Sequence, residues 1–230
     1  MADKEDLKCD GFALQRHHCC PEEKALSFYA LKHDIPFKWL QLPSQVPDGW
    51  VPCGTLKWMT ACIGRTVLPN YFPGFMGRFV TRKVWREDKW PLRKVFIKPA
   101  DEHKRFDGFV AHGTYSKKKR GPFWCSEIVS FVDEWRYYVA NGKLLGAHWY
   151  TGKGADLPQP PVAPAIDVEY PQGWCGTVDL GTLPDGRAEL VEAHPPFSVG
   201  WYGSDEEEFA RFTVAGWRWL MERRDMGEEA

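Results

Sequence analysis

The hydrophobic and polar positions follow two different rhythms along the chain, and the change falls near residue 94. Apolar runs at residues 12–14 and 36–42 predict two short strands. Between them, apolar residues recur at helical spacing after Pro21, and proline is favoured in the first turn of a helix. A strand, a helix and a strand in this order indicate a βαβ-like unit. Residues 43–77 are rich in proline and glycine, which predicts short elements and loops.

From residue 94 onward the pattern is typical of β-strands. Residues 95–97 form a compact apolar strand, and residues 123–132 are a second candidate. The clearest hairpin joins residues 134–140 to 143–150 through Asn141-Gly142, a dipeptide that two-residue hairpin loops favour. The change of pattern indicates that the chain leaves a small first domain before these strands begin.

The C-terminal part of the chain predicts a loop, a hairpin and a helix. Residues 151–172 are rich in proline, glycine and alanine, so we expect a loop or an insertion there. Two strands joined by an Asp185-Gly186 turn follow. Ser204-Asp205-Glu206-Glu207 matches a capping box, which predicts the start of a final helix. The apolar residues available for its buried face are Phe209, Phe212 and Leu220.

The hairpin at Asp185-Gly186 carries the most informative candidate chemistry. A two-residue loop there would set Asp179 directly opposite Glu192. Facing carboxylates repel each other, and a sheet keeps them most readily when a hard divalent cation lies between them. His194 lies two residues beyond Glu192, on the same strand face. The pattern therefore suggests a metal site, although a solvated face with two unrelated acids fits it equally, and a three-residue loop would place the acids on opposite faces.

Two further groups of charged residues accompany strands. Lys98 ends the apolar strand at 95–97, where it could serve as a point charge for phosphate or as a gatekeeper against aggregation. The run from Lys98 to Gly108 lacks the spacing of a P-loop. Glu134 and Arg136 share one strand face, which is either the wet side of the sheet or a pair aimed into a cleft.

Composition limits the classes of function. Of 230 residues, 43% are hydrophobic and 27% are charged, which is ordinary for a soluble globular protein. Thirty basic and thirty-one acidic residues leave almost no net charge, so nothing global favours nucleic acid or a membrane. The basic run Lys117–Arg120 invites a nucleic-acid interpretation, but four such residues in a loop are more often simply solvated, and a nearby anionic substrate is the intermediate alternative.

The cysteines give no strong metal or disulfide signal. Seven are scattered along the chain without a CxxC pair. Cys19-Cys20 beside His17-His18 is the one cluster that suggests zinc, yet adjacent residues point apart, so free or buried thiols are favoured. The first residues lack an apolar signal segment, and no apolar run reaches membrane-spanning length. We therefore expect a cytoplasmic protein in a reducing compartment.

Taken together and in this order, these runs resemble the ATP-grasp superfamily, and in particular a small-domain clade of bacteria and phages. The resemblance covers roughly residues 51–203 and is strongest from Val95 onward. It implies an α+β fold in which two lobes grip ATP, preceded by a short Rossmann-like domain. The division that follows is a pre-domain at residues 1–75 and an ATP-grasp domain at 76–230, with a hinge strand near 126–132.

The resemblance also implies roles for single residues. Lys98 lies where the first phosphate-binding lysine of the fold is found, and Lys104, with Phe106 and Gly108, is similar to the second lysine motif of the clade. Arg136 fits the arginine near the transferred phosphate. The positions similar to nucleotide-contacting ones are Glu127, Ile128, Val129 and Glu134.

Asp179 and Glu192 match the paired Mg²⁺ acids of the superfamily. Members usually carry asparagine two residues after the second acid, whereas this chain has His194. Imidazole is a softer ligand than an amide oxygen and is less suited to Mg²⁺. The departure leaves open Mn²⁺, a single metal, a lost activity, or a His194 that stays unligated and donates to phosphate.

The chemistry implied by the resemblance is that of a ligase. A carboxylate attacks the γ-phosphate of ATP to form an acyl phosphate, and an amine then gives an amide or peptide bond. The implied partners are small-molecule or peptide carboxylates and amines, with neither membrane nor nucleic acid, and a homodimer is left open. Two alternatives remain: a nucleotide-binding module without turnover, which His194 favours, and a nucleic-acid-associated protein, which the near-zero net charge disfavours.

Overall fold

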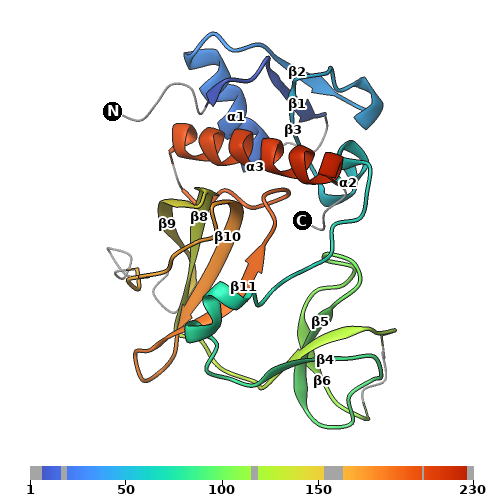
Figure 1. Ribbon diagram of the computed structural model, residues 1–230, viewed down its shortest axis with the longest axis vertical. Coiled ribbons are helices and arrows are strands. Elements are labelled where there is room, and N and C mark those ends of the chain that lie inside the picture. Colours follow the sequence, from blue (N-terminus) through green and yellow to red (C-terminus); the bar gives the residue numbers. More distant parts are fainter. Residues whose placement is uncertain (1–6, 17–19, 115–118, 153–162, 204, 227–230) are drawn as a thin grey trace.

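The computed structural model describes residues 7–16, 20–114, 119–152, 163–203 and 205–226. Within this part of the chain, Figure 1 shows three sheets, with a long C-terminal helix lying between the N-terminal sheet and the central one. The fold is a mixture of helices with several sheets, as the predicted α+β class requires. Among the described helices, none combines the length and the apolar character that crossing a bilayer requires.

The N-terminal unit is a small parallel sheet with order β2-β1-β3. Its elements are β1 (Phe12–Gln15), α1 (Pro21–Lys32), β2 (Phe37–Leu40), a 3-10 turn (Pro43–Gln45), β3 (Val51–Cys53) and α2 (Leu56–Ile63). The predicted strand, helix and strand are all present, and β1 pairs in parallel with both neighbours. Sequence patterns missed α2, which begins at a Thr55 cap and ends at Gly64 in a left-handed conformation. That this unit is a separate domain ending near residue 75 stays a prediction.

The second sheet is antiparallel, with order β4-β7-β5-β6. After a 3-10 segment (Gly74–Phe79) come β4 (Val84–Glu87), β5 (Val95–Pro99), β6 (Phe109–Ala111) and β7 (Phe123–Ser126). The prediction of one strand over residues 123–132 is wrong, because β7 ends at Ser126. Its ladder partners on β4 and β5 run out there, and the chain crosses to the next sheet without strand structure.

The central sheet has order β11-β10-β8-β9 and contains both predicted hairpins. Its strands are β8 (Asp133–Asn141), β9 (Lys143–Gly152), β10 (Gly173–Thr182) and β11 (Ala188–His194). Asn141 and Gly142 have φ values of 53° and 72°, the positive values that a tight hairpin turn between β8 and β9 needs. Because β9 reaches Gly152, the predicted loop starts two residues later than expected. Residues 163–172 have no helix or strand, and residues 153–162 lie outside the described part.

The β10–β11 hairpin reaches the predicted pairing by a different route. The Leu183 amide donates to the Arg187 carbonyl at 2.8 Å, so the loop has three residues rather than the predicted two. Leu180 pairs with Leu190, but the next pair is Asp179 with Glu192, because a bulge at Val191 adds one residue to β11. The extra loop residue and the bulge cancel. Asp179 therefore faces Glu192, as predicted, although the predicted turn is wrong.

The final helix, α3 (Glu206–Met226), joins the N-terminal unit to the central sheet. In Figure 1 it runs across the molecule between them. Phe209 and Phe212 share one buried cluster with Phe12 of β1, Leu26 of α1 and Tyr138 of β8. The predicted Ser204 of the capping box lies outside the described residues; the Asp205 side chain accepts the Glu208 amide at 2.5 Å and caps the helix.

Candidate functional site

Arg136 and Asp179 form a buried bidentate ion pair on neighbouring strands of the central sheet. The two residues are cross-strand partners on β8 and β10. Arg136 Nε donates to Asp179 Oδ1 at 2.8 Å and Arg136 Nη2 to Oδ2 at 2.6 Å. Burial alone would raise the pKa of Asp179, but the Arg136 charge and hydrogen bonds hold it below its ordinary value. Asp179 is thus a carboxylate whose two oxygens already face a cation.

Glu192 is the point where the two antiparallel sheets meet. Lys98, on β5 of the second sheet, donates from Nζ to Glu192 Oε2. His194 Nε2 lies 3.0 Å from Glu192 Oε1 and 3.9 Å from Asp179 Oδ2. The ligand atoms of Asp179, Glu192 and His194 all lie within 4.8 Å of one another. The structure therefore brings together the three residues predicted to hold a metal and adds the predicted phosphate lysine.

Lys98 is held in an environment that weakens its charge. Its Nζ lies 4.8 Å from the centre of the Tyr71 ring, over the ring face. Burial lowers the pKa of Lys98 to about 7, and the Asp179 charge only partly opposes this. Burial also raises the pKa of Tyr71 to about 12, so this ring stays neutral at physiological pH.

A second histidine completes the buried part of the site. His103 Nε2 lies 3.3 Å from His194 Nδ1, so one ring donates to the other in the neutral state. Burial lowers the pKa of His103 to about 2 and holds the pKa of His194 well below its ordinary value. Sequence patterns gave His103 no role, because nothing in its local run distinguishes it from its charged neighbours.

Lys104 and Glu134 lie around this group. Lys104 Nζ is 3.5 Å from the Ser198 carbonyl oxygen. The pKa of Lys104 is lowered by burial and then by the Arg136 charge, while Asp179 raises it. Glu134 pairs with Gly181 across β8 and β10, and its charge raises the pKa of Lys98. Both residues therefore interact electrostatically with the predicted site.

The residues predicted to contact the base lie apart from these charges. Glu127, Ile128 and Val129 follow the end of β7, in the segment that links the two antiparallel sheets. Glu127 exchanges hydrogen bonds with Lys83, its amide donating to the Lys83 carbonyl at 3.0 Å and its side chain accepting the Lys83 amide at 2.9 Å. The described contacts of these three residues do not join them to the carboxylates.

Sequence patterns missed a buried ion pair that holds the bulge in β11. Arg82 Nη1 lies 2.7 Å from Glu189 Oε1 and donates to the Leu190 carbonyl at 2.6 Å. Arg82 Nη2 donates to the Val191 carbonyl at 3.3 Å. The guanidinium thus supplies donors to carbonyl groups beside the bulge, where the regular ladder is interrupted. No sequence signal links an arginine so far upstream to this strand.

The donor set suits one divalent ion. Asp179 and Glu192 offer the carboxylate oxygens that Mg²⁺ prefers, and the imidazole of His194 also suits Mn²⁺. In the ion-free arrangement Arg136 and Lys98 neutralise the same two acids. An ion that binds both carboxylates would therefore replace these cations. Of the weaker candidates, His17, His18, Cys19, Lys117 and Lys118 lie outside the described residues, and Lys119 and Arg120 are exposed.

Two lobes with a lysine on one and paired acids on the other define an ATP-grasp protein. A protein-family model described as an ATP-grasp domain, the second family of its clade, matches residues 75–212. Since the match covers more than half of the chain, the chain belongs to this family. The predicted superfamily and its fold are confirmed. The matched residues include the whole group from Lys98 to His194.

Several solved structures are similar to the chain at low identity. One is a RimK domain protein ATP-grasp from Sphaerobacter thermophilus, at 13% identity, covering 92% of this chain and 98% of that one with a TM-score of 0.48. Others are N5-carboxyaminoimidazole synthase from Aspergillus clavatus (11%, 92% and 78%, 0.49) and D-alanine–D-alanine ligase from Bacillus anthracis (8%, 96% and 100%, 0.47). None of the three indicates the reaction of this chain. No curated protein sequence matches it.

Proposed function

We propose that this ATP-grasp protein is an ATP- and metal-dependent carboxylate–amine ligase that works through an acyl phosphate. The observation that carries the proposal is the convergence of cations from two sheets on two acids. Lys98 reaches Glu192 from the second sheet, while Arg136 holds Asp179 within the central sheet. Nucleotide triphosphates need this combination, because crowded phosphate charge is stabilised by fixed cations and by an ion held on carboxylates.

The residues divide the chemistry among them. Lys98, Lys104 and Arg136 supply positive charge to the phosphates. A divalent ion on Asp179 and Glu192, with His194 as third donor, would neutralise part of the phosphate charge when bound. Glu127, Ile128, Val129 and Glu134 would position the nucleotide.

The bonds that change involve only the substrates. An oxygen of the substrate carboxylate attacks the γ-phosphorus, and the bond from this phosphorus to the bridging oxygen breaks, which releases ADP. The amine nitrogen then attacks the acyl carbon, phosphate leaves with its oxygen, and the nitrogen loses a proton. No protein nucleophile is required, so the role of these side chains is to position the reactants and to balance charge.

ADP release tests the proposal. Wild-type protein is mixed with ATP, MgCl₂ and a pool of amino acids and small carboxylates, and ADP is measured by a coupled assay. Lys98→Ala and Glu192→Ala are expected to lose most of the activity while keeping the fold. Lys94→Ala is the matched control, because Lys94 precedes the same strand and is exposed. Wild-type rates from Lys98→Ala or Glu192→Ala would overturn the assignment.

A nucleotide-binding module without turnover is the second candidate. It is favoured by the complete pairing of Asp179 with Arg136 and by His194 at the position after the second acid. Tight ATP binding without ADP release from any acceptor would support the module. His194→Asn is expected to keep or raise Mg²⁺-supported activity, because an amide oxygen suits Mg²⁺ better than imidazole does. A large loss in this variant would make the imidazole essential.

A further inference from the structure

A cavity of about 360 Å³ lies between the N-terminal unit and the segment that leaves β11. The start of α1, the residues after β3, Lys104, the stretch from Pro196 to Gly200, and α3 all line it. This volume is at the small end of the range for ligand pockets in proteins, which is about 300–1,000 Å³. The nucleotide roles proposed above leave this cavity unused.

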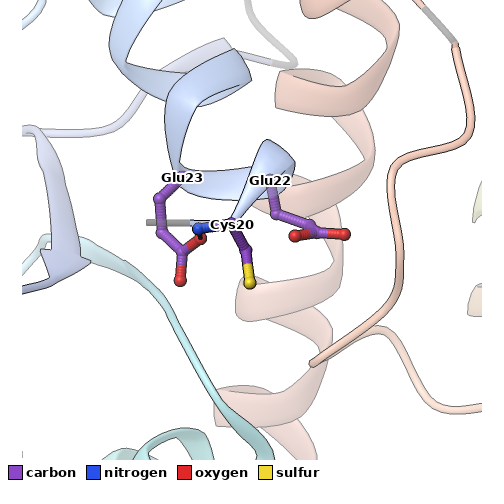
Figure 2. A group of neighbouring side chains, drawn as sticks. All are labelled: Cys20, Glu22 and Glu23. Carbon is purple, nitrogen blue, oxygen red and sulfur yellow. Dashed lines mark hydrogen bonds between the residues drawn. The ribbon is translucent and has the colours of Figure 1, made fainter. Parts of the chain in front are cut away.

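One end of the cavity is acidic. Figure 2 shows Cys20, Glu22 and Glu23 side by side at the first turn of α1. Glu23 is 1% exposed, and its Oε2 accepts the Cys20 amide at 3.1 Å, while Glu22 Oε1 accepts the Trp201 amide at 2.9 Å. Burial and then the charges of Glu23 and Glu22 raise the pKa of Cys53 well above its ordinary value. The two carboxylates are therefore held in place and impose a negative field on this end.

The other end adjoins the proposed reaction centre. Tyr202 lines the cavity, and its ring lies 4.9 Å from the Arg136 guanidinium. Lys104 also lines the cavity, and its pKa responds to Arg136 and Asp179 on one side and to Glu22 on the other. Among the described residues that line the cavity, Lys104 is the only lysine or arginine, so the two glutamates outnumber it. A cationic group on a ligand would balance this excess of negative charge.

The wall between the two ends is apolar. Met59, Phe197, Val199 and Phe212 are all buried and line it. Such a wall takes a short hydrocarbon group and excludes water from the charges at either end. A ligand that satisfies all three parts carries an ammonium group, a small apolar body and a carboxylate.

We propose that this cavity binds the carboxylate substrate of the ligase as an amino-acid zwitterion. Its ammonium group lies against Glu22 and Glu23, and its carboxylate points to Lys104 and Arg136. This inference rests on the proposed ligase function and adds the substrate class to it. A carboxylate in this position lies at the cation end of the cavity, next to the residues assigned to the phosphates.

Calorimetry on the full chain tests the inference without requiring turnover. Each of the twenty common L-amino acids is titrated, with and without the β,γ-imido analogue of ATP and Mg²⁺, and so is its N-acetyl derivative. We expect at least one amino acid to bind and its N-acetyl derivative to bind at least tenfold more weakly, because acetylation removes the ammonium charge. If no amino acid binds under either condition, or if acetylation changes nothing, the inference is wrong.

Two isosteric variants locate the ammonium group. Glu22→Gln and Glu23→Gln are each expected to weaken amino-acid binding at least tenfold and to leave affinity for the ATP analogue unchanged. Glutamine can still accept the Cys20 amide in the capping box, so the helix start is retained. Glu222→Gln, an exposed position on α3, is the matched control. Wild-type amino-acid affinity in both cavity variants would overturn the assignment.

Other outcomes separate this inference from the ligase proposal. Amino-acid binding without ADP release would support the cavity assignment and refute the ligase. ADP release that a carboxylate without an ammonium group supports as well as an amino acid does would keep the ligase and refute the cavity assignment. Zn²⁺ binding that Cys20→Ser and Glu22→Gln abolish, with no amino-acid binding, would instead make the acidic end a metal site.

Discussion

Arg82 provides a strong test of how the fold sets the distance between the paired acids. Its guanidinium and the Glu189 carboxylate form an ion pair in which the side chains are 6% and 0% exposed. The same guanidinium donates to the Leu190 and Val191 carbonyls beside the bulge. Arg82→Met keeps a long apolar side chain but removes both the charge and these donors.

The size of the effect follows from burial. Removing one partner of a buried ion pair typically costs about 3–5 kcal/mol, because the other charge is left without compensation. Against a total stability of about 5–15 kcal/mol for a typical protein, Arg82→Met should be only marginally folded. The double variant Arg82→Met/Glu189→Leu removes the stranded charge and should recover most of the stability. It does not restore donors to the bulge, so the position of Glu192 and affinity for ATP with Mg²⁺ should stay impaired.

Urea unfolding gives the stability of each variant, and calorimetry gives its affinity for ATP in MgCl₂. Arg78→Met is the control, because Arg78 is half exposed and lies 3.7 Å from a fully exposed Asp167, so little change is expected. A loss below about 1 kcal/mol in Arg82→Met would contradict the buried-pair argument. Recovery of both stability and wild-type ATP affinity in the double variant would show that Arg82 does not set the position of Glu192.

Three further outcomes follow from the site and its supports. Because burial lowers the pKa of Lys98 to about 7, its cation is lost as the pH rises through that value, so ATP affinity relative to Lys98→Arg should fall above pH 7; parallel pH profiles would contradict this. Below about pH 6.5 the unfolded chain protonates the imidazoles of His103 and His194 while the folded chain does not, so stability should fall by about 1.4 kcal/mol per pH unit for each, and His103→Gln should halve this slope in urea unfolding. A Cβ on Gly176 would lie 2.5 Å from the His194 carbonyl oxygen, so Gly176→Ala should lose about 1–3 kcal/mol, whereas Gly74→Ala, where the space is open, should not.

The β10–β11 hairpin shows what the sequence can predict and what it cannot. The facing of Asp179 and Glu192 follows from the Asp185-Gly186 turn only if the number of loop and bulge residues is right. The structure has one more loop residue and one bulged residue, Val191, so two errors cancel. The bulge depends on Arg82, far upstream in the chain, and such a contact leaves no local pattern.

The other differences have similar physical causes. The pairing of Asn141 and Gly142 with a tight turn is local, and the hairpin predicted there is present. The segment at residues 127–132 has apolar residues like a strand, but its ladder partners are absent where the chain changes sheets. The contact between Lys98 and Glu192 depends on how two sheets lie against each other, which the alternation within each strand does not specify.

The pairing of the charged residues suggests how one group of side chains can serve both the empty site and the filled one. Lys98 and Arg136 compensate Glu192 and Asp179 within the fold, so no buried charge is left alone before the nucleotide binds. A divalent ion on the two acids would release both cations, and the triphosphate that arrives with the ion needs cations. The exchange of partners keeps every buried charge compensated in both states. It therefore requires an ion and a polyphosphate together, which favours a metal–nucleotide complex over either component alone.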